Sequence, residues 1–147
     1  MNVSIASDHG GYLLKEKVLE HLLQNENLTV TDCGTFSQDS CDYPDFAIKA
    51  AVLVANGECD FGIVICTTGE GMAIVANKVK GVRCGLAVNK DMAEFSRKHN
   101  DANMLSLGAK YVSPETAFEL VDAFLSTDFE GGERHTRRVN RIKELEE

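Results

Sequence analysis

The chain has 147 residues, of which 44% are hydrophobic and 26% charged, proportions typical of one soluble globular domain. Its net charge of −8 disfavours nucleic acid as a partner. The first residues lack the basic and apolar regions of a signal peptide, and no apolar run approaches the roughly 20 residues that span a bilayer. We therefore expect a single cytoplasmic domain over residues 1–147 with no membrane partner.

The cysteine pattern argues against a disulfide framework and against a zinc knuckle. There are five cysteines, an odd number, and no two have CxxC spacing. We expect reduced thiols, most of them small buried residues. One segment departs from the acidic average: residues 134–138 are locally basic, which favours a small anionic ligand.

In the first half of the chain, apolar residues at helical spacing alternate with short apolar runs typical of strands. Leu14, Val18 and Leu22 recur at helical spacing, and residues 61–66 are nearly all apolar, as in a strand covered on both faces. The elements expected here are strands over 2–6, 28–31 and 61–66 and helices over 11–25 and from Pro44 to about Asn56.

The second half continues the alternation. A Gly-rich turn precedes a helix to about Lys80, and Ser113 followed by Pro114 has the pattern of a helix N-cap and first helical residue. The charged helix over 133–147 has few apolar anchors, which favours packing on a partner or closure over a site. The remaining expected elements are strands over 82–88 and 104–107 and a helix over 90–99.

Strands alternating with helices predict an α/β fold with a mainly parallel sheet. We expect a Rossmann-like three-layer α/β/α sandwich with a C-terminal helical arm from about residue 130 to 147. In such sheets, ligands bind outside the carboxyl ends of the strands. The polar residues with possible chemistry follow the first and third strands, at 7–10 and 66–69.

The strongest local signal is the segment 65–72, where a buried strand ends at Cys66 and leads through two glycines into a helix. Glycines let backbone N–H groups approach a ligand, and a helix start favours negative charge. A thiol at a helix N-terminus has a lowered pKa. The alternative is a tight turn with a buried cysteine. The segment matches neither the dinucleotide fingerprint nor the P-loop, whose lysine it lacks, which disfavours a nucleotide.

Two histidines are further candidates. Asp8 and His9 before two glycines suit a polar binding site, or else an N-cap aspartate with an exposed histidine. His99 ends a helix, where it serves as a general acid or base or is simply stabilised by the helix C-terminus. His21 lies beside Leu22 on the first helix and is expected to be structural.

Arg134 and Arg138 are four residues apart and share a helical face, which suits a phosphate dianion or else forms a solvated surface. Arg137 points elsewhere. Tyr43 stands at the site edge or packs a helix start. Glu70 is a second possible base, ranked below Cys66.

Taken together, these segments resemble the ribose-5-phosphate isomerase B family, which also contains allose- and galactose-6-phosphate isomerases. The resemblance covers nearly the whole chain and rests on residues 6–11, 32–35, 42–44, 62–71, 76–78, 97–103 and 131–138. It implies that Cys66 moves the proton between C1 and C2 while backbone amides of residues 67–71 stabilise the enediolate. Thr68 would assist proton transfer at the sugar oxygens, and His99 would open the furanose ring, with Asp8 on the ring-oxygen side.

The resemblance also implies the binding residues, no metal and no cofactor. It implies a homodimer, possibly paired into a tetramer, whose sites are shared, so that His99 acts on its neighbour's substrate and the C-terminal arm crosses the partner. The phosphate would lie among His9, Lys110, Arg134 and Arg138. The full set of expected substrate and phosphate contacts is His9, Tyr43, Thr67, Gly69, Glu70, Gly71, Asn100, Lys110, Arg134 and Arg138.

Three positions depart from the family pattern, and a fourth places the chain in one branch of the family. Thr67 stands where glycine is common, Lys110 where arginine is common, and Glu133 resembles a one-residue insertion. One branch has a glutamate base at the position of Met72, so this chain is of the cysteine type. We expect interconversion of ribose 5-phosphate and ribulose 5-phosphate. The alternatives are an allose- or galactose-6-phosphate isomerase and a non-catalytic phosphosugar-binding protein.

Overall fold

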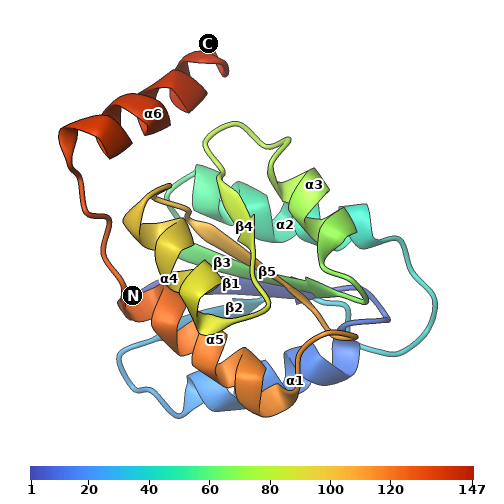
Figure 1. The fold of residues 1–147 in the computed structure, drawn as a ribbon. Helices are drawn as coiled ribbons and strands as arrows, with labels where there is room; N and C mark the ends of the chain where they lie inside the picture. The colour runs from blue at the N-terminus through green and yellow to red at the C-terminus, as the bar shows by residue number, and fades with distance from the viewer.

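The computed structural model describes residues 1–147 and contains five strands and six helices (Figure 1). The strands are β1 (Asn2–Ser7), β2 (Thr29–Asp32), β3 (Phe61–Cys66), β4 (Cys84–Leu86) and β5 (Met104–Gly108). The helices are α1 (Tyr12–Leu23), α2 (Tyr43–Ala55), α3 (Glu70–Ala76), α4 (Lys90–Lys98), α5 (Pro114–Ser126) and α6 (Glu133–Glu144). No helix is long and apolar enough to cross a membrane.

The five strands form one sheet in the order β2-β1-β3-β5-β4, and every neighbouring pair is parallel. The predicted α/β fold is confirmed, and the sheet is wholly rather than mainly parallel. The central strand β3 is buried from Gly62 to Cys66, as its nearly unbroken apolar sequence predicts. Parallel pairing brings the carboxyl ends of β1, β3 and β5 to one edge, with Ser7 opposite Ile65 and Cys66 opposite Gly108.

Helices cover both faces of the sheet, which confirms the three-layer arrangement (Figure 1). One core joins Val3, Ile5 and Ile63 of the sheet to α1, α4 and α5. The other joins Val64 and Cys66 to α2 and α3. The stripe predicted on α1 is buried as expected, through Leu14, Val18 and Leu22.

Local sequence signals account for several helix ends. The Ser113 hydroxyl accepts a hydrogen bond of 3.1 Å from the N–H of Thr116, which confirms the predicted N-cap. Proline stands in the first turn of both α2 and α5. Gly57 follows α2 with a φ of 77°, a left-handed conformation that suits glycine at a helix end.

Two predicted boundaries are wrong around residue 80. α3 ends at Ala76 instead of continuing to Lys80, because the Asn77 side chain donates to the Cys84 carbonyl at 2.9 Å and accepts from the Cys84 N–H at 2.7 Å. These bonds turn the chain toward β4. The strand expected over 82–88 is confined to Cys84–Leu86, since the N–H of Arg83 bonds the Asn103 side chain at 2.8 Å rather than a neighbouring strand.

Helix α6 lies outside the three layers and stands apart from them in Figure 1. Only Val139 of this helix is buried. Its approach is fixed at the end of α4, where the Glu130 N–H donates to the Lys98 carbonyl at 3.1 Å. Glu146, beyond the helix, bonds the N–H of Gly81. The sparsely apolar arm expected from the sequence is therefore present.

Candidate active site

Cys66 ends β3 at the carboxyl edge of the sheet, with 5% of its surface exposed. Its Sγ accepts a hydrogen bond of 3.1 Å from the N–H of Gly69. Gly69 precedes α3 with a φ of 81°, a conformation that L side chains rarely adopt. A Cβ at this position would also lie 3.0 Å from the backbone of Leu107. Glycine is thus required to turn the strand into the helix with its N–H donated to the sulfur.

The loop after Cys66 presents free backbone donors. The N–H groups of Thr67, Thr68 and Gly71 take part in no hydrogen bond of the chain, whereas those of Gly69 and Glu70 are used by Cys66 Sγ and Thr68 Oγ1. Unpaired N–H groups at the start of a helix attract negative charge. Three of the five amides expected to hold an oxyanion are therefore available for one.

Close packing holds this loop against the ends of β1 and β5. A Cβ on Gly10 would lie 2.2 Å from Thr67 Oγ1, and one on Gly108 would lie 2.5 Å from the Thr68 carbonyl oxygen. The Lys110 N–H donates to the Thr67 carbonyl at 2.9 Å. The structure thus brings together the first and third strand junctions, as the parallel-sheet rule predicts.

Asp8 and His9 lie beside this loop. Asp8 is 7% exposed, and its Oδ1 accepts a hydrogen bond of 3.0 Å from Gly11 N–H, so it fixes the turn before α1 and does not cap the helix itself. The exposed His9 ring accepts from the Cys41 N–H through Nδ1 at 3.3 Å. In a neutral ring, Nε2 then carries the proton and is the donor.

The Tyr43 ring covers the Gly-rich turn. A Cβ on Gly71 would lie 2.8 Å from that ring, so the phenol packs on the loop and remains 40% exposed. Glu70 and Lys110 are exposed at the same edge. Neither forms an ion pair in the chain. The carboxyl edge therefore gathers ten of the fourteen predicted site residues: Asp8, His9, Tyr43, Cys66, Thr67, Thr68, Gly69, Glu70, Gly71 and Lys110.

The other four predicted residues lie at the opposite edge. His99 caps the C-terminus of α4, and its ring stacks on His135 of α6 at a centroid distance of 4.3 Å. Asn100 follows it, just before the amino end of β5. Arg134 and Arg138 are exposed on α6 and make no hydrogen bond or ion pair, whereas Arg137 pairs with Glu133.

The length of β3 sets the distance between Cys66 at the carboxyl edge of the sheet and His99 at the amino edge. The Gly62 N–H donates to the Asn103 carbonyl at one edge, and Cys66 stands four residues further along the strand. Four residues of a strand span about 13 Å. His99 lies beyond Asn103, so it does not reach Cys66 of its own chain.

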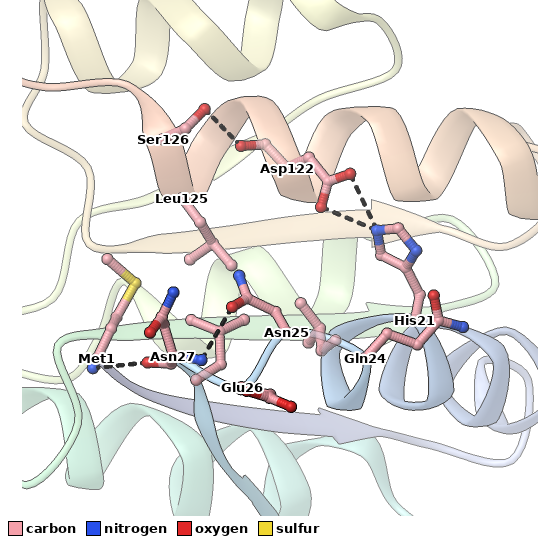
Figure 2. Close-up of a pocket in the computed structure, with 11 residues that line it drawn as sticks. Met1, His21, Gln24, Asn25, Glu26, Asn27, Asp122, Leu125 and Ser126 are labelled. Carbon is pink, nitrogen blue, oxygen red and sulfur yellow. Dashed lines mark hydrogen bonds and ion pairs between the residues drawn. The ribbon is translucent and has the colours of Figure 1, made fainter.

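His21, expected to be structural, lies at the amino edge as well. Figure 2 shows its ring facing the carboxylate of Asp122, with Nε2 at 2.9 Å and 3.0 Å from the two oxygens. The ring also stacks on Phe118 at 4.4 Å. The pair borders an open cleft of about 780 Å³ between the end of α1 and α5. This cleft contains none of the predicted site residues.

Three other cysteines are held as thiols by their surroundings. Burial raises the pKa of Cys33 to about 11 and that of Cys84 to about 12. Burial also raises the pKa of Cys59, with the carboxylates of Asp60 and Glu58 adding to the shift. These thiols are therefore poor nucleophiles at neutral pH.

Sequence reasoning missed the residues that support the site. The Ser106 hydroxyl donates to the Gly69 carbonyl at 2.6 Å and is fully buried. Its signal was a lone polar residue within an otherwise apolar strand. Glu130 and His135 lie beside His99, and the sequence holds no local signal for this grouping because it depends on a tertiary contact.

Known proteins share this architecture over nearly the whole chain. A family model described as Ribose/Galactose Isomerase matches residues 3–142. Ribose-5-phosphate isomerase B of Escherichia coli is 41% identical, over 99% of this chain and 96% of that protein. A relative from Rickettsia bellii, named as a sugar phosphate isomerase with no particular sugar, is 46% identical over 97% of both chains.

Solved structures agree closely. Ribose-5-phosphate isomerase B of Clostridium thermocellum is 49% identical with a TM-score of 0.95, covering 99% of this chain and 97% of its own. The Mycoplasma genitalium enzyme with bound ribulose-5-phosphate is 43% identical with a TM-score of 0.92, covering 99% and 95%.

The fold and the matched family define the class of protein: a sugar-phosphate isomerase that interconverts aldoses and ketoses. Within that class, the chain belongs to the ribose-5-phosphate isomerase B family, as its sequence motifs predicted.

Proposed function

We propose that the protein interconverts ribose 5-phosphate and ribulose 5-phosphate, with Cys66 as the base. The observation that carries this proposal is the Cys66 thiol, which accepts the Gly69 N–H beside three unpaired amides. The Mycoplasma genitalium relative with bound ribulose-5-phosphate supports a pentose as the substrate.

The residue types fit the reaction. The proton on the carbon next to a carbonyl is a weak acid, and its removal requires a base and stabilisation of the oxygen that gains charge. Cys66 takes the C2 proton of the open-chain aldose, exchanges it with solvent and delivers a proton to C1, while a proton passes from the O2 hydroxyl to O1. Between these steps, the N–H groups of Thr67, Thr68 and Gly71 hold the enediolate oxygen. Thr68 Oγ1, which accepts from Glu70 N–H at 3.3 Å, is free to donate its own proton to a sugar oxygen.

We further propose that two subunits complete each site in a homodimer. Cys66 and Asp8 lie at one edge of the sheet, and His99 lies at the other. A second subunit placing its His99 over the Cys66 loop would supply the group that opens the furanose ring. The same arrangement adds the unpaired guanidinium groups of Arg134 and Arg138 to His9 and Lys110 around the phosphate.

The test is turnover of ribose 5-phosphate in the presence of EDTA, measured for the wild type and for Cys66→Ala. We expect ribulose 5-phosphate from the wild type and a loss of about 10²- to 10⁴-fold in kcat for the variant, the usual contribution of a positioned base. Because the Cys66 side chain is small, the variant is expected to remain folded, which thermal unfolding checks.

Each other result has a defined meaning. Turnover of allose or galactose 6-phosphate but not of ribose 5-phosphate would keep the mechanism and replace the substrate. Full activity of Cys66→Ala would reject this base and point to Glu70. Failure of every sugar phosphate to react, with binding retained, would favour a phosphosugar-binding protein.

A further inference from the structure

A cluster of possible metal ligands lies at the amino edge, around the histidine that the proposed function uses. His99, Glu130 and His135 each offer a ligand atom, and these atoms all lie within 4.8 Å of one another. His135 Nε2 is 3.6 Å from a Glu130 oxygen. The three residues come from two segments, the end of α4 and residues 130–135, which lead into α6.

The cluster is held in place by the backbone. The Glu130 N–H donates to the Lys98 carbonyl, next to His99. Thr136 closes the intervening turn through bonds to the carbonyls of Gly131 at 3.0 Å and Gly132 at 2.9 Å. Phe95 also packs on the His99 ring, at a centroid distance of 4.8 Å. The ligands are thus gathered before any ion binds.

The spacing of one ligand pair is close to the spacing at a tetrahedral zinc ion. Two ligands at about 2.0–2.1 Å from zinc lie about 3.3 Å apart at a tetrahedral angle. The 3.6 Å between His135 and Glu130 nearly meets this value. The rings of His99 and His135 are stacked with 12° between them, so they must tilt apart before both nitrogens aim at one ion. Two imidazoles and a carboxylate form a ligand set used by zinc, with the fourth position open.

We propose that His99, Glu130 and His135 bind a divalent first-row transition ion such as zinc, and that the bound ion inhibits isomerisation. Coordination occupies the imidazole nitrogen that His99 would offer to the sugar ring. The inhibition, but not the binding, rests on the proposed function. The site is regulatory, and the Cys66 reaction itself needs no metal.

The binding test is a titration of the full chain with cobalt(II), followed by its visible absorption. Cobalt replaces zinc in such sites, and a near-ultraviolet sulfur-to-cobalt band would reveal any ion held by cysteines instead. We expect saturation at one ion per chain without the sulfur band, and a loss of affinity of at least tenfold in His135→Gln and Glu130→Gln. His21→Gln is the matched control, because it also removes a histidine that faces a carboxylate.

The inhibition test uses the isomerase assay with added zinc. We expect zinc to inhibit the wild type reversibly, with EDTA restoring the rate, and Glu130→Gln to need at least tenfold more zinc. Equal cobalt affinity of the wild type and both cluster variants, or no binding at all, overturns the site. Tight binding without an effect on an active isomerase overturns the inhibition. If no sugar phosphate reacts, the proposed function fails, and the cobalt titration alone decides the metal site.

Discussion

Mixing two inactive variants tests the sharing of each site between subunits. Cys66→Ala removes the proposed base, and His99→Asn removes the proposed ring-opening group. Gly62, four residues before Cys66, bonds Asn103, and His99 lies beyond it at the far edge of the sheet. The span of those four residues, about 13 Å, exceeds the roughly 3 Å over which a side chain transfers a proton. Each site therefore needs Cys66 from one chain and His99 from the other. Each variant alone should be inactive, because all of its sites lack one of these two groups.

Random pairing of the two variant chains sets how much activity the mixture should regain. In an equal mixture refolded together, half of the dimers contain one chain of each kind, and one of their two sites combines an intact Cys66 with an intact His99. The mixture should regain about one quarter of the wild-type rate per chain. The same count predicts about one quarter, not one half, when the wild type is mixed with the double variant.

The assay is ribose 5-phosphate turnover before and after joint refolding, with a sizing measurement to confirm dimers. No recovery in the first mixture together with one half of the rate in the second would show that each chain holds a complete site. A monomer with full activity would refute the shared site as well.

Three further predictions use other parts of the structure. Gly108→Ala should cost about 1–3 kcal/mol of unfolding free energy and lower kcat, because its Cβ would lie 2.5 Å from a backbone carbonyl oxygen of the catalytic loop. A Cβ on Gly132 would meet nothing within 4 Å, so Gly132→Ala should change neither quantity. Denaturant melts and rate assays measure the two effects. Thermal stability should fall as pH rises from about 9 toward 12, because the pKa of Cys84 is about 12 in the folded chain and about 9 in the unfolded chain. Cys84→Ala should reduce the slope of this decline by up to about 1.4 kcal/mol per pH unit. Arg134→Gln should raise KM for the sugar phosphate about 10- to 100-fold, the loss of a charged hydrogen bond, while Arg137→Gln, whose guanidinium already pairs with a glutamate, should change KM little.

The fold followed from the sequence because its signals are local and repeated. The apolar run of β3 and the N-cap Ser113 each predicted what the structure contains. The end of α3 did not follow, since it depends on Asn77 bonding Cys84 seven residues away. Helical propensity carries no information about such a bond.

The carboxyl-edge half of the site was also predictable, because parallel strands end together. Asp8 and Cys66 are 58 residues apart in sequence, yet Asp8 follows β1 and Cys66 ends the neighbouring strand β3 at the same edge of the sheet. The grouping of His99 with Glu130 and His135 was not predictable, since it depends on how α6 meets the end of α4. Because α6 is charged and has only one buried residue, its sequence does not indicate which part of the chain it contacts.

The exchange of substrate hydrogen with solvent tests proton transfer by Cys66 most directly. Ribose 5-phosphate is converted in D₂O, and deuterium at C1 of ribulose 5-phosphate is followed by proton NMR for the wild type and for Cys66→Ser, which keeps the size of the side chain. Transfer through an enediolate predicts deuterium at C1 with the wild type and a rate at least 10²-fold lower with the variant. Equal rates for the two proteins would contradict Cys66 as the base.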